Sequence, residues 1–417
     1  MRSIWDYLPF LMVGFPPPSG LHCPTNWGKT GILPAKLRPL FISDNVMPQK
    51  LEFVSCTEEW TGSVRAFNGR MLAGGLEEEL CFPEPCPVER DAGLEAALSR
   101  EYFLAVEGRE VRGAYFLTYE TWVANRQHHR VANFRLPLSE GFVDTRYRGT
   151  GRALLSDALQ KCPRLYCLGL GNQGRPLPRM LAGQNWMIME TPFYFRCIHP
   201  REVLRNLTWL RTSPIRRLLM DAAAGTGGWQ AIAALQRIRT QAPSSESATT
   251  VTGDFGDWAD ELWTRACNAY SLLADRSRDF LRARYPATDA RFRRLVVRSE
   301  SGVCGWAVVL ATSMRDHRHF GNLQVGTIVD CLAVPGKEHV VISAATDFLE
   351  GLAVDLIVSN QSHRNWRAAF DHAGYLSGPT NRFFTPSPEL ACLLLPFDQK
   401  LPLTHLTRGD GAGPIHL

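Results

Sequence analysis

Two stretches of this 417-residue chain carry similar landmarks in the same order and at a nearly constant offset. Each stretch has a valine after a central strand, an Asn-Gln pair after a short strand, an aromatic residue after a short helix and a phenylalanine in its last strand. The pairs are Val143 and Val334, Asn172 and Asn360, Trp186 and Tyr375, and Phe195 and Phe384. Chance alignment of common residue types is the alternative, but four nearly equal separations favour two copies of one fold.

Length and composition agree with two domains in a soluble protein. The chain is long for one domain, and 45% hydrophobic with 21% charged residues is typical of a globular protein rather than a disordered or collagen-like one. The net charge of +5 leaves room for an anionic ligand, but a nucleic-acid partner would need a more basic, clustered surface. No apolar run reaches the roughly 18 residues of a membrane span. We therefore expect neither a nucleic-acid partner nor a membrane span, and leave the oligomeric state open.

The pattern of apolar residues and breakers predicts an α/β chain in five parts. Hairpin strands, a central strand, a helix and a short strand follow one another in both stretches. The predicted boundaries are an extension at 1–46, disordered or preceding a true start at Met47; a first copy at 47–200; a helical connector and Ser/Thr-rich linker at 201–252; a second copy at 253–398; and a tail at 399–417.

Cysteine and histidine spacing gives no metal or redox motif. Eleven cysteines include no Cys-x-x-Cys pair, so we expect free, mostly buried thiols in a reducing cytoplasm. His128, His129, His317 and His319 lack carboxylate or cysteine partners at ligand spacing. We therefore expect no metal and a cytoplasmic location.

The most informative stretch is the turn between a strand that closes near Val143 and a helix that begins near Gly151. Gly149 and Gly151 allow a tight turn and close approach of a ligand, and the first amides of a helix attract anions. Arg146, Arg148 and Arg152 add the charge that suits a diphosphate. A plain strand-to-helix turn with solvated arginines explains the glycine spacing equally well.

The run Arg146-Tyr147-Arg148-Gly149-Thr150-Gly151 resembles the acyl-CoA pyrophosphate loop, Arg-x-x-Gly-x-Gly, of the GNAT acetyltransferase superfamily. The resemblance covers roughly residues 50–198 and implies two GNAT-like folds in tandem, each a mixed central sheet flanked by helices. It implies that the amides from Arg148 to Ala153 hold the pyrophosphate of acetyl-CoA, the co-substrate. It also implies that Phe142 and Val143 pair with the pantetheine arm as an added strand would, beside two diverging strands.

Acetyl transfer to an amine requires a base, for which Glu140 is the candidate. Asp330 is its counterpart in the second stretch, and Glu120 is the second choice. A strand-end carboxylate bonded to a neighbouring loop is the alternative reading of Glu140. Many GNAT enzymes carry a thiolate-protonating Tyr where this chain has Leu181, so Tyr194 or water would have to serve.

The second copy lacks the arginine–glycine loop. It reads Val334-Pro-Gly-Lys-Glu-His there, so we expect no acyl-CoA site in it, only a structural partner or a wall of the acceptor cleft. Two further sets of polar residues could either bind a ligand or have an ordinary structural role, and the structural role is favoured for both. They are Asn360, Gln361, His363 and Trp366, as acceptor-binding groups or a satisfied polar loop, and the arginines at 201, 205, 211, 216 and 217, as an anion-binding surface or a solvated helix face.

The sequence therefore predicts a cytoplasmic tandem GNAT-like N-acetyltransferase. It would move an acetyl or other acyl group from CoA to a small-molecule or peptide amine by direct transfer, since no Cys or Ser stands beside a base as a nucleophile. A non-catalytic acyl-CoA sensor or scaffold is the alternative function.

Overall fold

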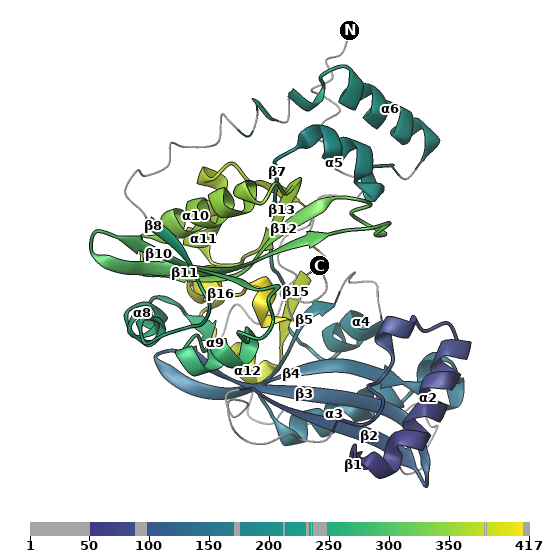
Figure 1. Cartoon of the computed structure of the whole chain (residues 1–417). Helices are drawn as coiled ribbons and strands as arrows, with labels where there is room; N and C mark the ends of the chain where they lie inside the picture. Colours follow the sequence, from purple (N-terminus) through teal and green to yellow (C-terminus); the bar gives the residue numbers. More distant parts are fainter. Residues whose placement is uncertain are drawn as a thin grey trace.

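The chain folds into two mixed sheets with helices on their outer faces and between their ends, which confirms the predicted α/β class (Figure 1). The computed structural model describes residues 51–87, 98–170, 176–211, 213–230, 233, 234, 236, 248–378, 380 and 382–411. The predicted extension and the landmark Asn172-Gln173 lie outside these residues. No described helix is both long enough and apolar enough to cross a membrane.

The first sheet, sheet A, occupies the lower part of Figure 1. Its strands are β1 (Glu52–Ser55), β2 (Ser99–Glu107), β3 (Glu110–Ala124), β4 (Gln127–Ser139), β5 (Leu165–Leu170), β6 (Met189–Glu190) and β15 (Arg382–Pro386), with β9 (Leu272–Ala274) and β16 (Thr404–His405) attached at the end of β3. Sheet B contains β7 (Phe193–Cys197), β8 (Ala248–Thr252), β10 (Arg293–Ser299), β11 (Gly302–Ser313), β12 (Gln324–Ala333), β13 (Leu356–Asn360) and β14 (Leu376–Gly378).

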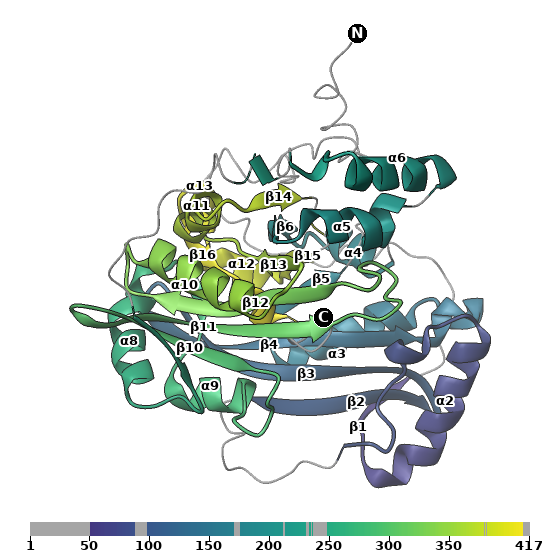
Figure 2. The same ribbon diagram turned by 45° about the horizontal axis from the view of Figure 1, so that its top comes forward.

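Helices follow the strands as the apolar periodicity predicts. They are α2 (Thr61–Ala73), α3 (Thr150–Lys161), α4 (Pro176–Ala182), α5 (Pro200–Asn206), α6 (Pro214–Gly225), α8 (Trp258–Ala266), α9 (Arg278–Arg284), α10 (Glu338–Gly351), α11 (Arg364–His372), α12 (Pro388–Cys392) and α13 (Phe397–Lys400). Figure 2 shows α5 and α6 beyond one end of the sheets, with α6 outermost.

The two sheets have the same strand order, which supports duplication. Sheet A runs β1-β2-β3-β4-β5-β15-β6, and sheet B runs β8-β10-β11-β12-β13-β7-β14. Along each of these orders, antiparallel strands lead to one parallel pair, β4 with β5 or β12 with β13. A helix, α3 or α10, connects that pair.

The copies exchange one strand. β7, from the first half, pairs with β13 and β14, while β15, from the second half, pairs with β5 and β6. The landmark phenylalanines, Phe195 and Phe384, lie in these exchanged strands. The prediction that residues 47–200 form the first copy is therefore wrong for β7, because a strand's alternating pattern fits the edge of either sheet equally well.

A glycine at the same place in each sheet lets the connecting helix pack closely. A Cβ on Gly113 of β3 would lie 2.7 Å from Thr150 Cγ2 at the start of α3. A Cβ on Gly305 of β11 would lie 2.3 Å from Val341 Cγ2 in α10. The shared contact indicates that both copies set their helices against the sheet in the same way.

Three described segments differ from the sequence expectation. Cys56 and Cys86 form a disulfide, with Cα atoms 5.7 Å apart, so the prediction of free thiols is wrong for this pair. The bond joins residues 30 apart, a spacing that no local motif marks, and it removes the thiol argument for a reducing compartment. The segment predicted as a linker and connector includes β8, and the one predicted as a tail contains β16 and the fully buried Leu406.

Candidate functional site

The central strands of sheet A separate at their carboxyl ends. β4 and β5 pair only at Ala132–Leu165 and Asn133–Tyr166, although both strands continue beyond these residues. A register shift opposite β3 accompanies Leu136, whose φ is +46°. A bulge of this kind re-aims a strand and leaves part of its edge unpaired, so the end of β4 has backbone groups available beside β5.

The predicted loop follows directly, as two short 3-10 turns, η5 (Glu140–Phe142) and η6 (Thr145–Tyr147), and then α3. Gly149 has an ordinary helical φ of −75°, and nothing lies within 4 Å of the position of its Cβ. Glycine here gives open access to the backbone rather than a special conformation. The position where a side chain would not fit is Gly141 instead, because a Cβ there would lie 2.4 Å from the Tyr147 carbonyl oxygen.

Three backbone amides at the start of α3 have no acceptor among the described residues: those of Gly149, Thr150 and Gly151. The other predicted amides are used internally, because Arg148 donates to the Thr145 carbonyl and Arg152 and Ala153 donate to that of Gly149. Unpaired amides at a helix start favour an anion.

The predicted arginines flank these amides in the sequence, and all three are exposed. Arg146 pairs with Asp144 (Nη2 to Oδ2, 2.7 Å), whereas Arg148 and Arg152 form no ion pair with any residue in the described part of the chain. The Arg146 side chain is thus partly neutralised, and the other two carry the available charge.

Phe142 and Val143 do not form the strand-like edge that the resemblance implies. Phe142 ends the 3-10 turn η5, and the Val143 amide donates to the Glu140 carbonyl over 2.9 Å. The Phe142 side chain is 59% exposed beside the loop. Pairing with an extended ligand is thus available along the end of β4 rather than at these two residues.

Glu140 is buried, with both carboxylate oxygens in contact with arginines. Its Oε1 accepts from Arg70 Nε of α2 at 2.7 Å, and its Oε2 accepts from Arg112 Nη1 of β3 at 3.1 Å. It therefore joins α2 and β3 to the start of the loop, which is the structural alternative considered for this residue.

Neither Leu181, which stands at the usual position of the thiolate-protonating Tyr, nor Tyr194, the proposed substitute, belongs to the loop. Leu181 is fully buried in the core against α3, and Tyr194 belongs to β7 in sheet B. The Tyr194 hydroxyl accepts from Arg367 Nε at 3.2 Å, which uses it within sheet B.

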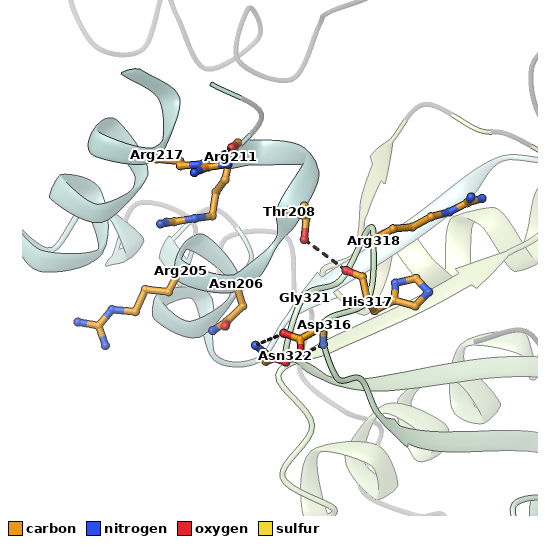
Figure 3. Close-up of a pocket in the computed structure, with 10 residues that line it drawn as sticks. All are labelled: Arg205, Asn206, Thr208, Arg211, Arg217, Asp316, His317, Arg318, Gly321 and Asn322. Carbon is orange, nitrogen blue, oxygen red and sulfur yellow. Dashed lines mark hydrogen bonds between the residues drawn. The ribbon is translucent and has the colours of Figure 1, made fainter. Parts of the chain in front are cut away.

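Arginines from the connector line a hollow of about 600 Å³ at the other end of sheet B (Figure 3). It lies between the α5–α6 hairpin and the β11–β12 connection, joined where Thr208 Oγ1 donates to the His317 carbonyl over 3.4 Å. Its charged lining comprises Arg205, Arg211, Arg217, Arg318 and Asp316. None of the loop residues 140–153 lines it.

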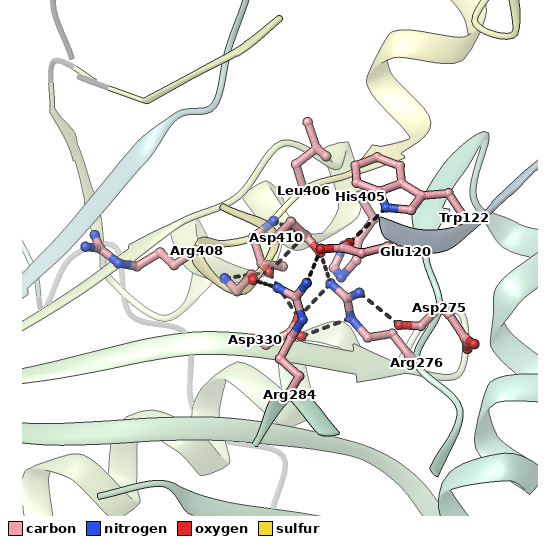
Figure 4. Close-up of polar contacts among 12 residues, drawn as sticks. Glu120, Trp122, Asp275, Arg276, Arg284, Asp330, His405, Leu406, Arg408 and Asp410 are labelled. Atoms are coloured by element: carbon pink, nitrogen blue, oxygen red, sulfur yellow. Dashed lines mark hydrogen bonds and ion pairs between the residues drawn. The ribbon is translucent and has the colours of Figure 1, made fainter. Parts of the chain in front are cut away.

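A buried ionic cluster joins the two halves (Figure 4). Arg276, which is fully buried, contacts Asp330 of β12 (Nε to Oδ2, 2.9 Å) and Asp410 near the chain end (Nη2 to Oδ1, 2.5 Å). Arg284 of α9 pairs with Glu120 of β3. Burial raises the pKa of Asp330, whereas for Asp410 the charges of Arg276 and Arg284 outweigh burial and lower the pKa.

Two more arginines extend this interface cluster without a carboxylate within 4 Å among the described residues. Arg382 Nη1, from β15, donates to the Arg408 carbonyl at 2.9 Å, and Arg408 Nη1 donates to Asn360 Oδ1 at 3.0 Å. Burial lowers the pKa of Arg382 to about 10, and burial and the charge of Arg382 lower that of Arg408. The cluster of Glu120, Arg276, Arg284, Asp330, Arg382, Arg408 and Asp410 therefore holds four cations against three anions.

Among the polar residues at the end of β13, Asn360, Gln361 and Trp366 are hydrogen-bonded inside the protein, as expected for a structural loop, whereas His363 Nε2 is buried without a partner among the described residues. The Asn360 side chain donates to the Thr191 carbonyl, and Gln361 Oε1 accepts from the amides of Ser362 and His363. Trp366 Nε1 donates to the Tyr270 hydroxyl at 3.0 Å.

Sequence reasoning missed Asp410, Arg276 and Arg284. One signal was present, because Thr407 and Asp410 form a capping box around the 3-10 turn η10 (Arg408–Asp410), and a Thr-x-x-Asp pattern is readable in a sequence. It indicates a turn start rather than a charged site between the copies.

No protein-family model and no curated protein sequence matches this chain. Solved structures similar to it include N-myristoyltransferase of Saccharomyces cerevisiae with myristoyl-CoA (11% identity, 83% of this chain, 81% of that one, TM-score 0.45). A GCN5-related N-acetyltransferase from Anabaena variabilis (9%, 81% and 72%, 0.47) is another. A tandem GNAT protein from the clavulanic acid biosynthesis pathway (14%, 81% and 98%, 0.42) is a third.

Proposed function

We propose that the chain is an acyl-CoA-dependent N-acyltransferase with a single acyl-CoA site, at the start of α3. The observation that carries this proposal is the set of three amides without an acceptor, at Gly149, Thr150 and Gly151, beside the exposed Arg148 and Arg152. Amides and guanidinium groups together suit a diphosphate. The unpaired end of β4 lies directly before this loop, where a pantetheine arm would add as a strand does.

The reaction that fits this arrangement is direct transfer. The amine nitrogen of the acceptor attacks the thioester carbonyl carbon, the carbon–sulfur bond breaks, and CoA leaves as a thiolate. The proton that the amine loses would pass through water to this thiolate, which gives free CoA thiol. An amide of the bulged end of β4 would donate to the carbonyl oxygen as it becomes an oxyanion. The exposed Phe142 ring would cover the acyl arm from outside.

Glu140 is proposed to position the loop rather than to take the amine proton. Two arginines already hold its carboxylate, so removing its charge should loosen the loop. Glu140→Gln should then weaken acetyl-CoA binding as well as turnover. If the residue is instead the base, turnover falls sharply while acetyl-CoA affinity is unchanged.

The acceptor is proposed to be an amine that also carries a carboxylate. The excess positive charge of the interface cluster supports this, because buried charges are ordinarily balanced. Arg382 of β15 lies opposite Leu170, the last residue of β5, so β5 alone separates its strand from β4. Amino acids should therefore be acetylated faster than the matched amines and amino-acid amides, and equal rates would contradict this choice.

The test of the function is release of free CoA thiol from acetyl-CoA in a screen of amines, with acetyl-CoA binding measured in parallel. Thiol release that depends on both acetyl-CoA and an amine supports the enzyme. Binding without thiol release supports the sensor that was the alternative function. Absence of binding contradicts both.

A further inference from the structure

The α5–α6 hairpin carries the strongest concentration of exposed apolar side chains in the described chain. Ile215, Leu218 and Leu219 of α6 are 73%, 71% and 50% exposed. Their spacing of three and four residues places them on one face of the helix. The other large exposed apolar residues are scattered singly over the two sheets and loops, as is normal for a surface.

The opposite face of α6 is the one that packs on the protein. Met220 and Ala224 are buried against Leu204 of α5, and together they form a small apolar core for the hairpin. α6 therefore has one apolar face used for packing and a second, opposite one without cover among the described residues. Figures 1 and 2 both show α6 outermost, with α5 between it and sheet B.

The same hairpin is rich in arginine. Residues 200–225 contain five arginines and two acidic residues, so the segment carries a net charge of +3 within a chain whose total is +5. Both acids are engaged, because Asp221 pairs with Arg211 at 2.6 Å and Glu202 lies 3.7 Å from Arg205. Arg217 Nε donates to the Arg211 carbonyl, which orients its guanidinium toward the hollow of Figure 3.

We propose that the α5–α6 hairpin docks this protein on the surface of a lipid bilayer that contains anionic lipids. The bare face of α6 would enter the boundary between headgroups and acyl chains, as an amphipathic helix lying in the interface does. The arginines of the hairpin would be attracted to the negative headgroups from within a Debye length. Charge complementarity selects this occupant, because an apolar contact with a second copy would bring two segments of charge +3 together.

The experiment is co-sedimentation of the whole protein with extruded vesicles of phosphatidylcholine alone or mixed with phosphatidylglycerol. Binding should be about tenfold or more tighter to the anionic vesicles and should weaken as salt is added. The double variant Ile215→Asp with Leu218→Asp should lose about tenfold or more of the binding. Leu352→Asp is the matched control, since this 44%-exposed leucine follows α10 on sheet B, and it should bind as the wild type does.

Three results would overturn the proposal: no binding to anionic vesicles at low salt, equal loss in the Leu352→Asp control, or a dimer by light scattering that the double variant converts to a monomer. Because the substituted side chains are exposed, the variants should keep the thermal unfolding midpoint of the wild type. Membrane binding does not depend on the proposed acyl transfer, so either can fail alone.

Discussion

The turn after β4 and the turn after β12 occupy the same place in two sheets of the same strand order, yet they differ in what they present. The first offers exposed arginines, and no acidic residue lies in the first turn of α3. The second has one lysine, Lys337, and begins α10 with Glu338, which puts a carboxylate where a diphosphate would have to bind. Packing contacts, such as those of Gly113 and Gly305, are shared, so the turn residues are what distinguish the copy proposed to bind acyl-CoA from the other copy.

The largest expected effect is on the free energy of unfolding, and it distinguishes Asp330 from Glu140, the acids at corresponding places in the two copies. Asp330→Asn should lower the free energy of unfolding by about 3–5 kcal/mol, because it removes a partner from a fully buried arginine. Glu140→Gln should cost less, since its partner Arg70 is 35% exposed and can regain water. Urea unfolding followed by tryptophan fluorescence measures both. If Glu140→Gln lowers the free energy of unfolding as much as Asp330→Asn or more, the explanation by the different burial of Arg276 and Arg70 is contradicted.

The next effect distinguishes the two turns as ligand sites. The double variant Arg148→Glu with Arg152→Glu should weaken acetyl-CoA binding about 100-fold, because two charge-assisted contacts become repulsive. Lys337→Glu, the matched change in the second copy, should leave the affinity unchanged. Titration calorimetry gives both values. If Lys337→Glu also weakens acetyl-CoA binding, the ligand binds at the second copy, which would contradict the proposed site.

A smaller effect comes from the paired glycines. Gly113→Ala and Gly305→Ala should each cost about 1–3 kcal/mol of stability, because the new methyl group meets a side chain of the connecting helix. Only Gly113→Ala should also weaken acetyl-CoA binding, since it displaces Thr150, whose amide belongs to the loop. Thermal unfolding with and without acetyl-CoA separates the two outcomes. Equal ligand responses would mean that the loop is not coupled to this packing.

The last effect is a pH dependence of stability that arises in the second half. Burial lowers the pKa of His363 to about 4 and that of His405 to about 3. Between pH 6.5 and these values the unfolded chain binds protons that the folded chain does not, so stability falls as the pH falls. Each histidine contributes about 1.4 kcal/mol per pH unit in that window. The urea midpoint of unfolding should decrease from pH 7.5 to pH 5, and His405→Gln should make its dependence on pH less steep. If the variant has the same pH dependence as the wild type, the contribution assigned to His405 is contradicted.

Local structure was largely predictable from the sequence, because hydrophobic period and turn residues act over short distances. The expected order of hairpin strands, central strand, helix and short strand is found, and the helix expected to begin near Gly151 begins at Thr150. The sequence also located the loop arginines, which are exposed as a ligand site requires.

Long-range pairing was not predictable. The exchange of β7 and β15 depends on which of two similar sheet edges each strand meets, and the apolar pattern is the same for both. The Cys56–Cys86 bond and the contact of Asp410 with Arg276, 134 residues apart, likewise depend on the assembled fold. The contacts of Glu140 depend on arginines of α2 and β3, so a carboxylate near a loop could not be identified as base or support from its position alone.

The unequal roles of the two copies are tested most directly by the stoichiometry of acetyl-CoA binding to the whole chain. Titration calorimetry should give one site per chain, which the Arg148→Glu, Arg152→Glu variant loses and Lys337→Glu retains. Two sites per chain, or one site that survives the double arginine variant, would contradict the account.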